Sequence, residues 1–130
     1  MPLTPGLSAQ AAMQVTRANC ASAVGSGAVD VFATPMMIAL MEQAAADAVA
    51  PYLAEDEVTV GTRVAVEHVA ATPPGMTVRA VATLEAVEGR RLVFRVDAFD
   101  DRERIGGGTH ERLVVNRAKF LARAGEKALS

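Results

Sequence analysis

The chain has 130 residues, 51% of them hydrophobic and 22% charged, which is the composition of a single globular domain and excludes a disordered chain. A formal net charge of −2 offers no basic surface to phosphates, so no nucleic-acid partner is expected, and no apolar run is long enough to cross a bilayer. The first residues do not resemble a signal peptide, and Cys20 is the only cysteine, so we expect a cytoplasmic protein with no disulfide, no metal site and no cofactor.

The first part of the sequence predicts a strand, a loop and a long helix. Residues 10–17 alternate loosely and are expected to form a strand, whereas residues 18–30 are nearly all small and predict a mobile loop. Pro35 suits the first position of a helix, Thr34 can cap that helix, and Pro51 ends it after about 15 residues. Because the helix sequence, PMMIALMEQAAADAVA, is apolar on nearly every side, we expect other elements to enclose it.

The rest of the sequence predicts an antiparallel meander and a short terminal helix at 118–128. Its four strands are expected at residues 57–69, 76–87, 91–99 and 105–116. One apolar helix followed by long strands predicts the α+β hotdog fold, in which an antiparallel sheet of about five strands wraps round the helix. We expect residues 1–130 to form one such domain with loosely ordered ends at 1–9 and 125–130. The exposed sheet edges predict a homodimer or a higher homo-oligomer.

Glu42 is the first residue that stands out chemically. Its helical neighbours at three and four positions are all apolar, namely Ile38, Ala39, Ala45 and Ala46. One interpretation is a carboxylate that reaches solvent or meets an arginine. The other is a desolvated carboxylate with a raised pKa, suited to act as a base or a nucleophile.

His68 is the second such residue. If its strand alternates regularly, His68 shares a face with Val58, Val60, Thr62, Val64 and Val66, which predicts that the ring is buried. A structural histidine with satisfied hydrogen bonds is the commoner explanation, and a proton carrier beside a carboxylate is the alternative. His110 lies among Thr109, Glu111 and Arg112 and is expected to be a partly exposed strand histidine.

Thr34 has two compatible roles. As a helix cap it would satisfy a backbone N–H, and at a helix N-terminus its hydroxyl also lies where a developing oxyanion is stabilised. Thr34 and Glu42 are eight residues apart, which is about 12 Å along a straight helix. They therefore cannot touch within one chain, and a dimer with antiparallel helices is one way to bring them to a common substrate.

Several short segments together resemble one family. They are FATP (32–35), ALME (39–42), TVGT (59–62), VEHVAATP (66–73) and GTHER (108–112). In this order and spacing they resemble the fluoroacetyl-CoA thioesterase-like family of hotdog proteins over residues 32–122. The resemblance implies a hydrolase of small acyl-CoA thioesters that works as a dimer, with its active sites at or near the subunit interface.

The resemblance also implies roles for particular residues. It assigns catalysis to Thr34, Glu42 and His68, and it places Gly61 and Arg112 at the acyl end of the substrate. The fluoroacetyl-specific member carries an aromatic lid before the helix, whereas here residues 18–31 contain no aromatic side chain and only Phe32 lies close. We therefore expect Phe32 to contact the substrate and another small or medium acyl group to be the natural one.

Three other functions stay open. A non-catalytic hotdog that binds acyl-CoA or another small ligand would keep the pocket, although it has no need of a buried carboxylate. A hotdog hydratase or dehydratase uses an Asp/His pair in a local motif that this sequence lacks. A purely structural oligomer would use Glu42 and His68 as a buried polar pair. Release of coenzyme A from an acyl-CoA distinguishes the thioesterase from all three.

Overall fold

A computed structural model of the chain describes residues 2–129. Strand β1 (Ser8–Gln14) is followed by a 3-10 turn (Arg17–Asn19), the short helix α1 (Ala21–Val24) and the long helix α2 (Thr34–Val49). After a second 3-10 turn (Ala50–Tyr52) come strands β2 (Glu57–His68), β3 (Thr77–Glu88), β4 (Arg91–Phe99) and β5 (Arg104–Asn116), and then helix α3 (Arg117–Glu126). No helix within residues 2–129 is long and apolar enough to span a membrane.

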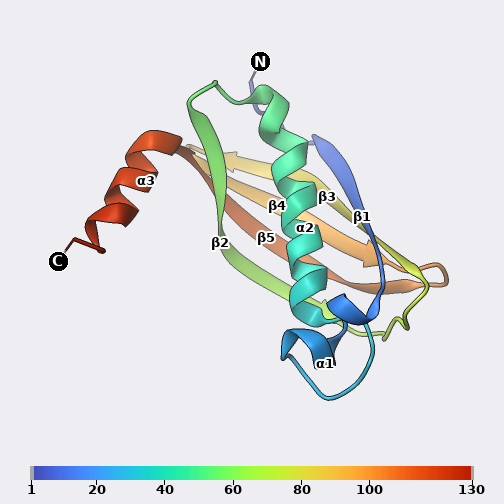
Figure 1. Ribbon diagram of the computed structural model, residues 1–130. Coiled ribbons are helices and arrows are strands. Elements are labelled where there is room, and N and C mark those ends of the chain that lie inside the picture. Colours follow the sequence, from blue (N-terminus) through green and yellow to red (C-terminus); the bar gives the residue numbers. More distant parts are fainter. Residues whose placement is uncertain (1, 130) are drawn as a thin grey trace.

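The five strands form one antiparallel sheet in the order β1-β3-β4-β5-β2, and α2 lies across one face of it (Figure 1). The core fills the space between that face and the helix. From the helix it contains Met37, Leu40 and Met41, which pack against strand residues such as Phe94 and Leu84. The predicted α+β hotdog arrangement, one long helix and a sheet of five antiparallel strands, is confirmed.

The strands occur close to the predicted positions, but the predicted meander is wrong at its first strand. Strands β3, β4 and β5 do follow one another as hairpins, whereas β2 pairs with β5, and β1 occupies the free side of β3. The Pro73-Pro74-Gly75 turn reverses the chain without bringing β2 to β3. The connection instead runs past Phe32, whose N–H donates to the carbonyl of Thr72. A turn signal predicts a reversal, but the partner of the next strand depends on long-range contacts.

A bulge in β2 changes which of its residues share a face. Gly61 lies opposite Arg112, but Arg63 lies opposite Glu111, so Thr62 is an extra residue in the strand. Because residues that face each other across an antiparallel pair lie on the same side of the sheet, His68 lies on the helix side with Thr59, Gly61, Val64 and Val66. The prediction that His68 shares a face with Val58 and Val60 is therefore wrong.

The helix α2 is enclosed on one side only, so the prediction that other elements surround it is wrong for the single chain. An exposed stripe runs along the face turned away from the sheet and consists of Thr34, Pro35, Ala39, Gln43 and Asp47. Most of the helix sequence is apolar, but its polar residues Gln43 and Asp47 both lie on this exposed face. The capping prediction is also wrong, because the N-cap residue is Ala33 and Thr34 is the first residue of the helix.

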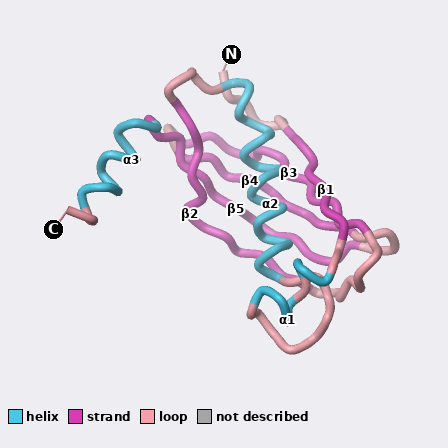
Figure 2. The backbone as a smooth tube through the Cα atoms, viewed as in Figure 1, coloured by secondary structure: helices cyan, strands magenta, loops and turns pink. Residues whose placement is uncertain are grey.

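The segment predicted as a loop, residues 18–30, contains helix α1 and contributes Cys20 and Ala21 to the buried residues. It folds under the N-terminal end of α2 (Figure 2). Of the two ends expected to be loosely ordered, Met1 and Ser130 lie outside the described residues, Ser8 and Ala9 belong to β1, and Gly125 and Glu126 belong to α3. Helix α3 projects away from the sheet beside β2 (Figure 1) and has no buried residue.

Candidate active site

Thr34 and His68 form a hydroxyl–imidazole pair at the N-terminus of α2. The Oγ1 atom of Thr34 lies 2.7 Å from Nδ1 of His68. Thr34 reaches this position because it begins the helix, and His68 because it ends β2 on the helix side of the sheet. The pair lines a pocket of about 340 Å³ together with residues of the segment before α2, among them Phe32. The structure thus brings together two of the predicted catalytic residues and one predicted substrate contact.

His68 is held in its neutral form. Burial lowers the pKa of its imidazole below the ordinary value of 6.5, and a weaker interaction with the Ala70 backbone acts in the opposite direction. Its Nε2 atom is shielded from solvent and has no hydrogen-bond partner within residues 2–129. A neutral ring bonded to a hydroxyl through Nδ1 can accept the hydroxyl proton, which is what a general base does.

Glu42 forms the centre of a second group of polar side chains. Its Oε2 atom lies 3.1 Å from Nη1 of Arg112, which reaches the carboxylate from β5. Gly61 lies beside both residues, since a Cβ at this position would overlap Oε2 of Glu42 and lie 3.3 Å from Nη1 of Arg112. The carboxylate is 39% exposed, so of the two interpretations the structure shows the one in which Glu42 meets an arginine.

His110 and Thr59 belong to the same group, and the sequence did not reveal either role. The prediction of a partly exposed His110 is wrong, because its side chain is only 1% exposed and its Nε2 atom lies 3.2 Å from Nη1 of Arg112. Thr59 accepts from Arg112 Nε through Oγ1 at 2.9 Å and from Nη2 through its carbonyl at 3.0 Å. The sequence did contain one indication that His110 belongs with Arg112: the two residues are two positions apart on one strand and hence lie on one face of the sheet.

The two groups are separate within one chain. Six residues of β2 lie between Gly61 and His68, which is about 20 Å of extended strand. No hydrogen bond or ion pair joins Thr34 or His68 to Glu42 in the part of the chain that the structure describes. The structure therefore agrees with the expectation that Thr34 and Glu42 do not touch within one chain.

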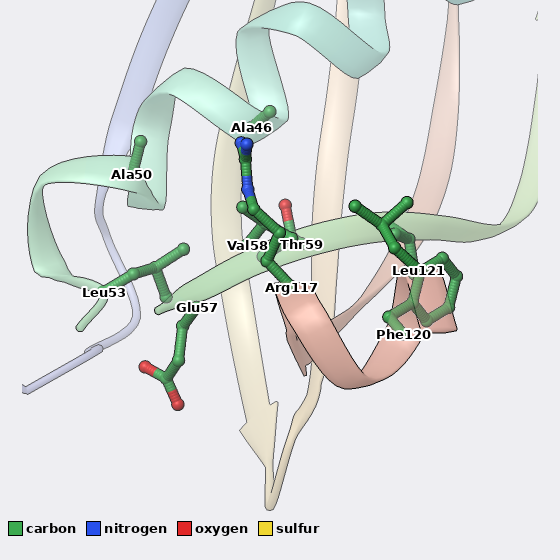
Figure 3. Close-up of a pocket in the computed structure, with 10 residues that line it drawn as sticks. Ala46, Ala50, Leu53, Glu57, Val58, Thr59, Arg117, Phe120 and Leu121 are labelled. Carbon is green, nitrogen blue, oxygen red and sulfur yellow. The ribbon is translucent and has the colours of Figure 1, made fainter. Parts of the chain in front are cut away.

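A second hollow, of about 560 Å³, lies at the opposite end of α2 (Figure 3). It is formed by the C-terminal half of α2, the start of β2 and the helix α3, with a mostly apolar lining that includes Leu53, Phe120 and Leu121. It contains none of the predicted catalytic residues. The smaller pocket at Thr34 and His68 is therefore the candidate active site, although its lining is less apolar than that of the larger hollow.

The polar groups of the site suit acyl transfer. A helix N-terminus with a hydroxyl stabilises negative charge on a carbonyl oxygen, a neutral imidazole moves a proton, and a carboxylate activates water or attacks a carbonyl carbon. Within residues 2–129 no three His, Cys, Asp or Glu side chains come together as metal ligands.

The sequence matches the family model described as fluoroacetyl-CoA-specific thioesterase over residues 15–118. The chain belongs to this family. It is 52% identical over 98 residues to the fluoroacetyl-CoA thioesterase of Streptantibioticus cattleyicolor, a match that covers 75% of this chain and 70% of that protein.

Two solved structures show how far the fold agrees. The fluoroacetyl-CoA thioesterase FlK superposes with a TM-score of 0.92 at 40% identity, covering 98% of each chain. A Thermus thermophilus protein described as a thioesterase superfamily member superposes with a TM-score of 0.88 at 34% identity, covering 97% of this chain and 96% of that one. The resemblance inferred from the short segments is confirmed, and so is the expectation that this chain is a thioesterase, a hydrolase of thioesters.

Proposed function

We propose that this thioesterase hydrolyses the thioester of a small or medium acyl-CoA at the pocket beside α2, with Thr34, His68 and Glu42 as its reactive groups. The observation that carries the proposal is the 2.7 Å contact between Thr34 Oγ1 and His68 Nδ1 at the N-terminus of the helix. The name of the 52% identical relative supports an acyl-CoA substrate. Because residues 18–31 contain no aromatic side chain that could form the lid of the fluoroacetyl-specific member, we propose an acyl group other than fluoroacetyl.

In the proposed reaction the thioester carbonyl lies at the N-terminus of α2. The positive end of the helix and the Thr34 hydroxyl stabilise the oxyanion as the tetrahedral intermediate forms. Glu42 either takes a proton from the attacking water or attacks the carbonyl carbon itself to give a transient anhydride that water then opens. In the first route His68, neutral before the reaction, passes the water proton from Glu42 to the departing thiolate sulfur; in the second, coenzyme A leaves as the thiolate, and His68 takes the proton from the water that opens the anhydride and passes it to that sulfur. The products are the free acid and coenzyme A.

The site is completed by a second copy of the chain. Thr34 and His68 of one protomer would meet Glu42 and Arg112 of another if a two-fold axis set two α2 helices antiparallel. Two features support a homodimer of this kind. The exposed stripe of α2 (Thr34, Pro35, Ala39, Gln43 and Asp47) has no cover in the single chain, and β2 is an edge strand of 12 residues whose outer side is unpaired in the described structure.

The direct test is thiol release from a panel of short, branched and aromatic acyl-CoAs, with Glu42→Gln measured alongside. Activity well above background that collapses in the variant supports the proposal. Release that survives the substitution would keep the thioesterase and remove Glu42 from the mechanism. If the folded protein binds acyl-CoA without releasing thiol, the chain is a binding protein.

Mixing two inactive variants tests the shared site. Thr34→Ala and Glu42→Gln chains are unfolded together and refolded, so that half of the dimers are mixed. If Thr34 and Glu42 act across the interface, each mixed dimer has one complete site, and about a quarter of the unmodified activity returns. If both residues act from one chain, no mixed dimer contains a complete site and the activity stays at the level of the variants.

We also propose a cytoplasmic location for the enzyme. The support is that Cys20, a buried residue, is the only cysteine of the sequence, so the fold uses no disulfide within the chain, as is usual in a reducing compartment. Recovery of the native protein in the membrane fraction or outside the cell would contradict this part of the proposal.

A further inference from the structure

His110 lies at the centre of the sheet, in surroundings that leave it little freedom. Its side chain is 1% exposed, it lies opposite Val64 of β2 and Phe94 of β4, and its ring centroid is 6.2 Å from that of Phe94. Its Nδ1 atom lies 2.7 Å from the carbonyl oxygen of Arg63, the first residue after the bulge in β2. The ring is thus held by packing on both sides and by one hydrogen bond to the backbone.

The partners of the two ring nitrogens determine the protonation state of His110. A carbonyl oxygen only accepts, so Nδ1 carries a hydrogen and donates it to Arg63. A guanidinium only donates, so Nε2 has to offer its lone pair to Nη1 of Arg112, 3.2 Å away. Both bonds exist together only in the neutral ring with its hydrogen on Nδ1.

Arg112 receives support at every part of its guanidinium. One Nη1 hydrogen goes to His110 and the other to Glu42, while Nε and Nη2 donate to Thr59. These bonds fix the plane of the guanidinium and therefore also the direction of the Nη1 hydrogen that points at the Glu42 carboxylate. Without the bond to His110, the Nη1 end would be held by Glu42 alone.

The orientation of Glu42 depends on this guanidinium. The carboxylate is 39% exposed on a helix surface, and the neighbouring Gly61 has no side chain to confine it. Within residues 2–129 its hydrogen bond and its ion pair with Arg112 both fall on Oε2, which leaves Oε1 to face a water molecule or a thioester carbon.

We propose that His110 is a positioning residue of the thioesterase: as a neutral acceptor it holds the Arg112 guanidinium against Glu42 and so keeps Oε1 aimed at the substrate. This inference rests on the proposed role of Glu42. A second proton on His110 would replace the acceptor by a donor that faces the hydrogens of Arg112, and the bond between them would be lost.

The charged groups around His110 act in both directions. Burial lowers the pKa of His110, and the positive charge of Arg112 lowers it further, whereas the Arg63 carbonyl and the carboxylates of Glu42 and Glu111 raise it. Burial is the largest of these effects, so the ring is neutral near pH 7.

A matched pair of variants separates the two nitrogens. His110→Gln places an amide oxygen near the former Nε2 and keeps an acceptor for Arg112, whereas His110→Asn keeps a group near Nδ1 and loses that acceptor. We expect His110→Asn to lower kcat for acyl-CoA hydrolysis by about tenfold with little change in KM, and His110→Gln to retain most of kcat. Equal losses in the two variants, or a loss confined to KM, would overturn the proposal.

A double-mutant cycle with Arg112→Lys tests whether His110 acts through Arg112. Lysine cannot form the guanidinium contacts, so His110→Asn should cost little further activity in this background. If the two losses simply multiply, His110 acts independently of Arg112 and the proposal is overturned.

Nitrogen NMR of the unmodified protein gives a measurement that needs no catalysis. We expect His110 between pH 7 and 8 to be a neutral ring with its hydrogen on Nδ1, and a hydrogen on Nε2 would overturn the inference. If the unmodified chain releases no thiol although the ring has the expected form, the proposed function fails, and the catalytic meaning of His110 fails with it. Full activity with the wrong ring form would refute the positioning alone.

Discussion

Thr34 Oγ1 and His68 Nδ1 lie 2.7 Å apart, although the two residues are 34 positions apart in the chain. The contact exists because the first residue of α2 and the last residue of β2 meet at the same end of the molecule. It leaves the hydroxyl of Thr34 bonded to a side chain on a distant strand, where the sequence had predicted a helix cap. The position of this hydroxyl beside a neutral imidazole supports a role for Thr34 in thioester hydrolysis.

Removing the Thr34 hydroxyl should therefore lower activity without unfolding the protein. We expect Thr34→Ala to reduce kcat by about 100-fold, the usual effect of losing a group that stabilises an oxyanion, and Thr34→Ser to retain most of the activity. Thiol release measures the effect. Because Thr34 is exposed and does not cap the helix, the Tm of both variants should stay close to that of the unmodified protein.

The acid side of the pH profile should report His68. Since burial lowers the pKa of His68 below 6.5, the ring is neutral at pH 7 and gains its proton only in more acidic solution. We expect kcat/KM to fall on the acid side with its midpoint at the pKa of the folded protein, below pH 6.5. A midpoint above pH 6.5 would contradict the assignment, and His68→Gln should lack activity throughout the range.

A methyl group at Gly61 should disturb Glu42. The new Cβ would overlap Oε2 of Glu42, so the carboxylate or the strand has to move. We expect Gly61→Ala to lower kcat at least tenfold and to change Tm little, since Gly61 is exposed on an edge strand. Gly125→Ala is the matched control, because its Cβ meets no atom within 4 Å. Unchanged kinetics in Gly61→Ala would show that the position of Glu42 is unimportant.

Stability should also depend on pH through the two histidines. Burial lowers the pKa of both His68 and His110 in the folded protein, so below pH 6.5 the unfolded chain binds protons that the folded chain does not. The free energy of unfolding should therefore be highest above pH 6.5 and decrease as the pH falls from there toward the pKa values of the folded state. Urea unfolding at several pH values measures this slope, and it should be shallower in His110→Gln. A slope unchanged by that substitution would show that His110 does not contribute.

The sequence by itself determined the long helix, the four long strands and the family of the chain. Pro35 and Pro51 mark the limits of a helix because proline fits the first turn of a helix and not its interior. Alternating valines and glycine turns place β4 at the predicted residues and β2, β3 and β5 within one residue at each end. The resemblance depends on residues in short segments, which is why the sequence alone predicts Thr34, Glu42 and His68 as the site residues.

Only the tertiary structure decided how these elements meet. The pairing of β2 with β5 and the bulge at Thr62 depend on contacts between residues about 50 positions apart, and the bulge decides on which face His68 lies. The burial of His110 follows from the same pairing. The residues next to it in the strand point to the other face of the sheet, and Arg112, two positions on, is itself buried beside it. Periodicity describes one strand at a time, whereas side-chain partners such as Glu42 and Arg112 are chosen by the way separate elements pack.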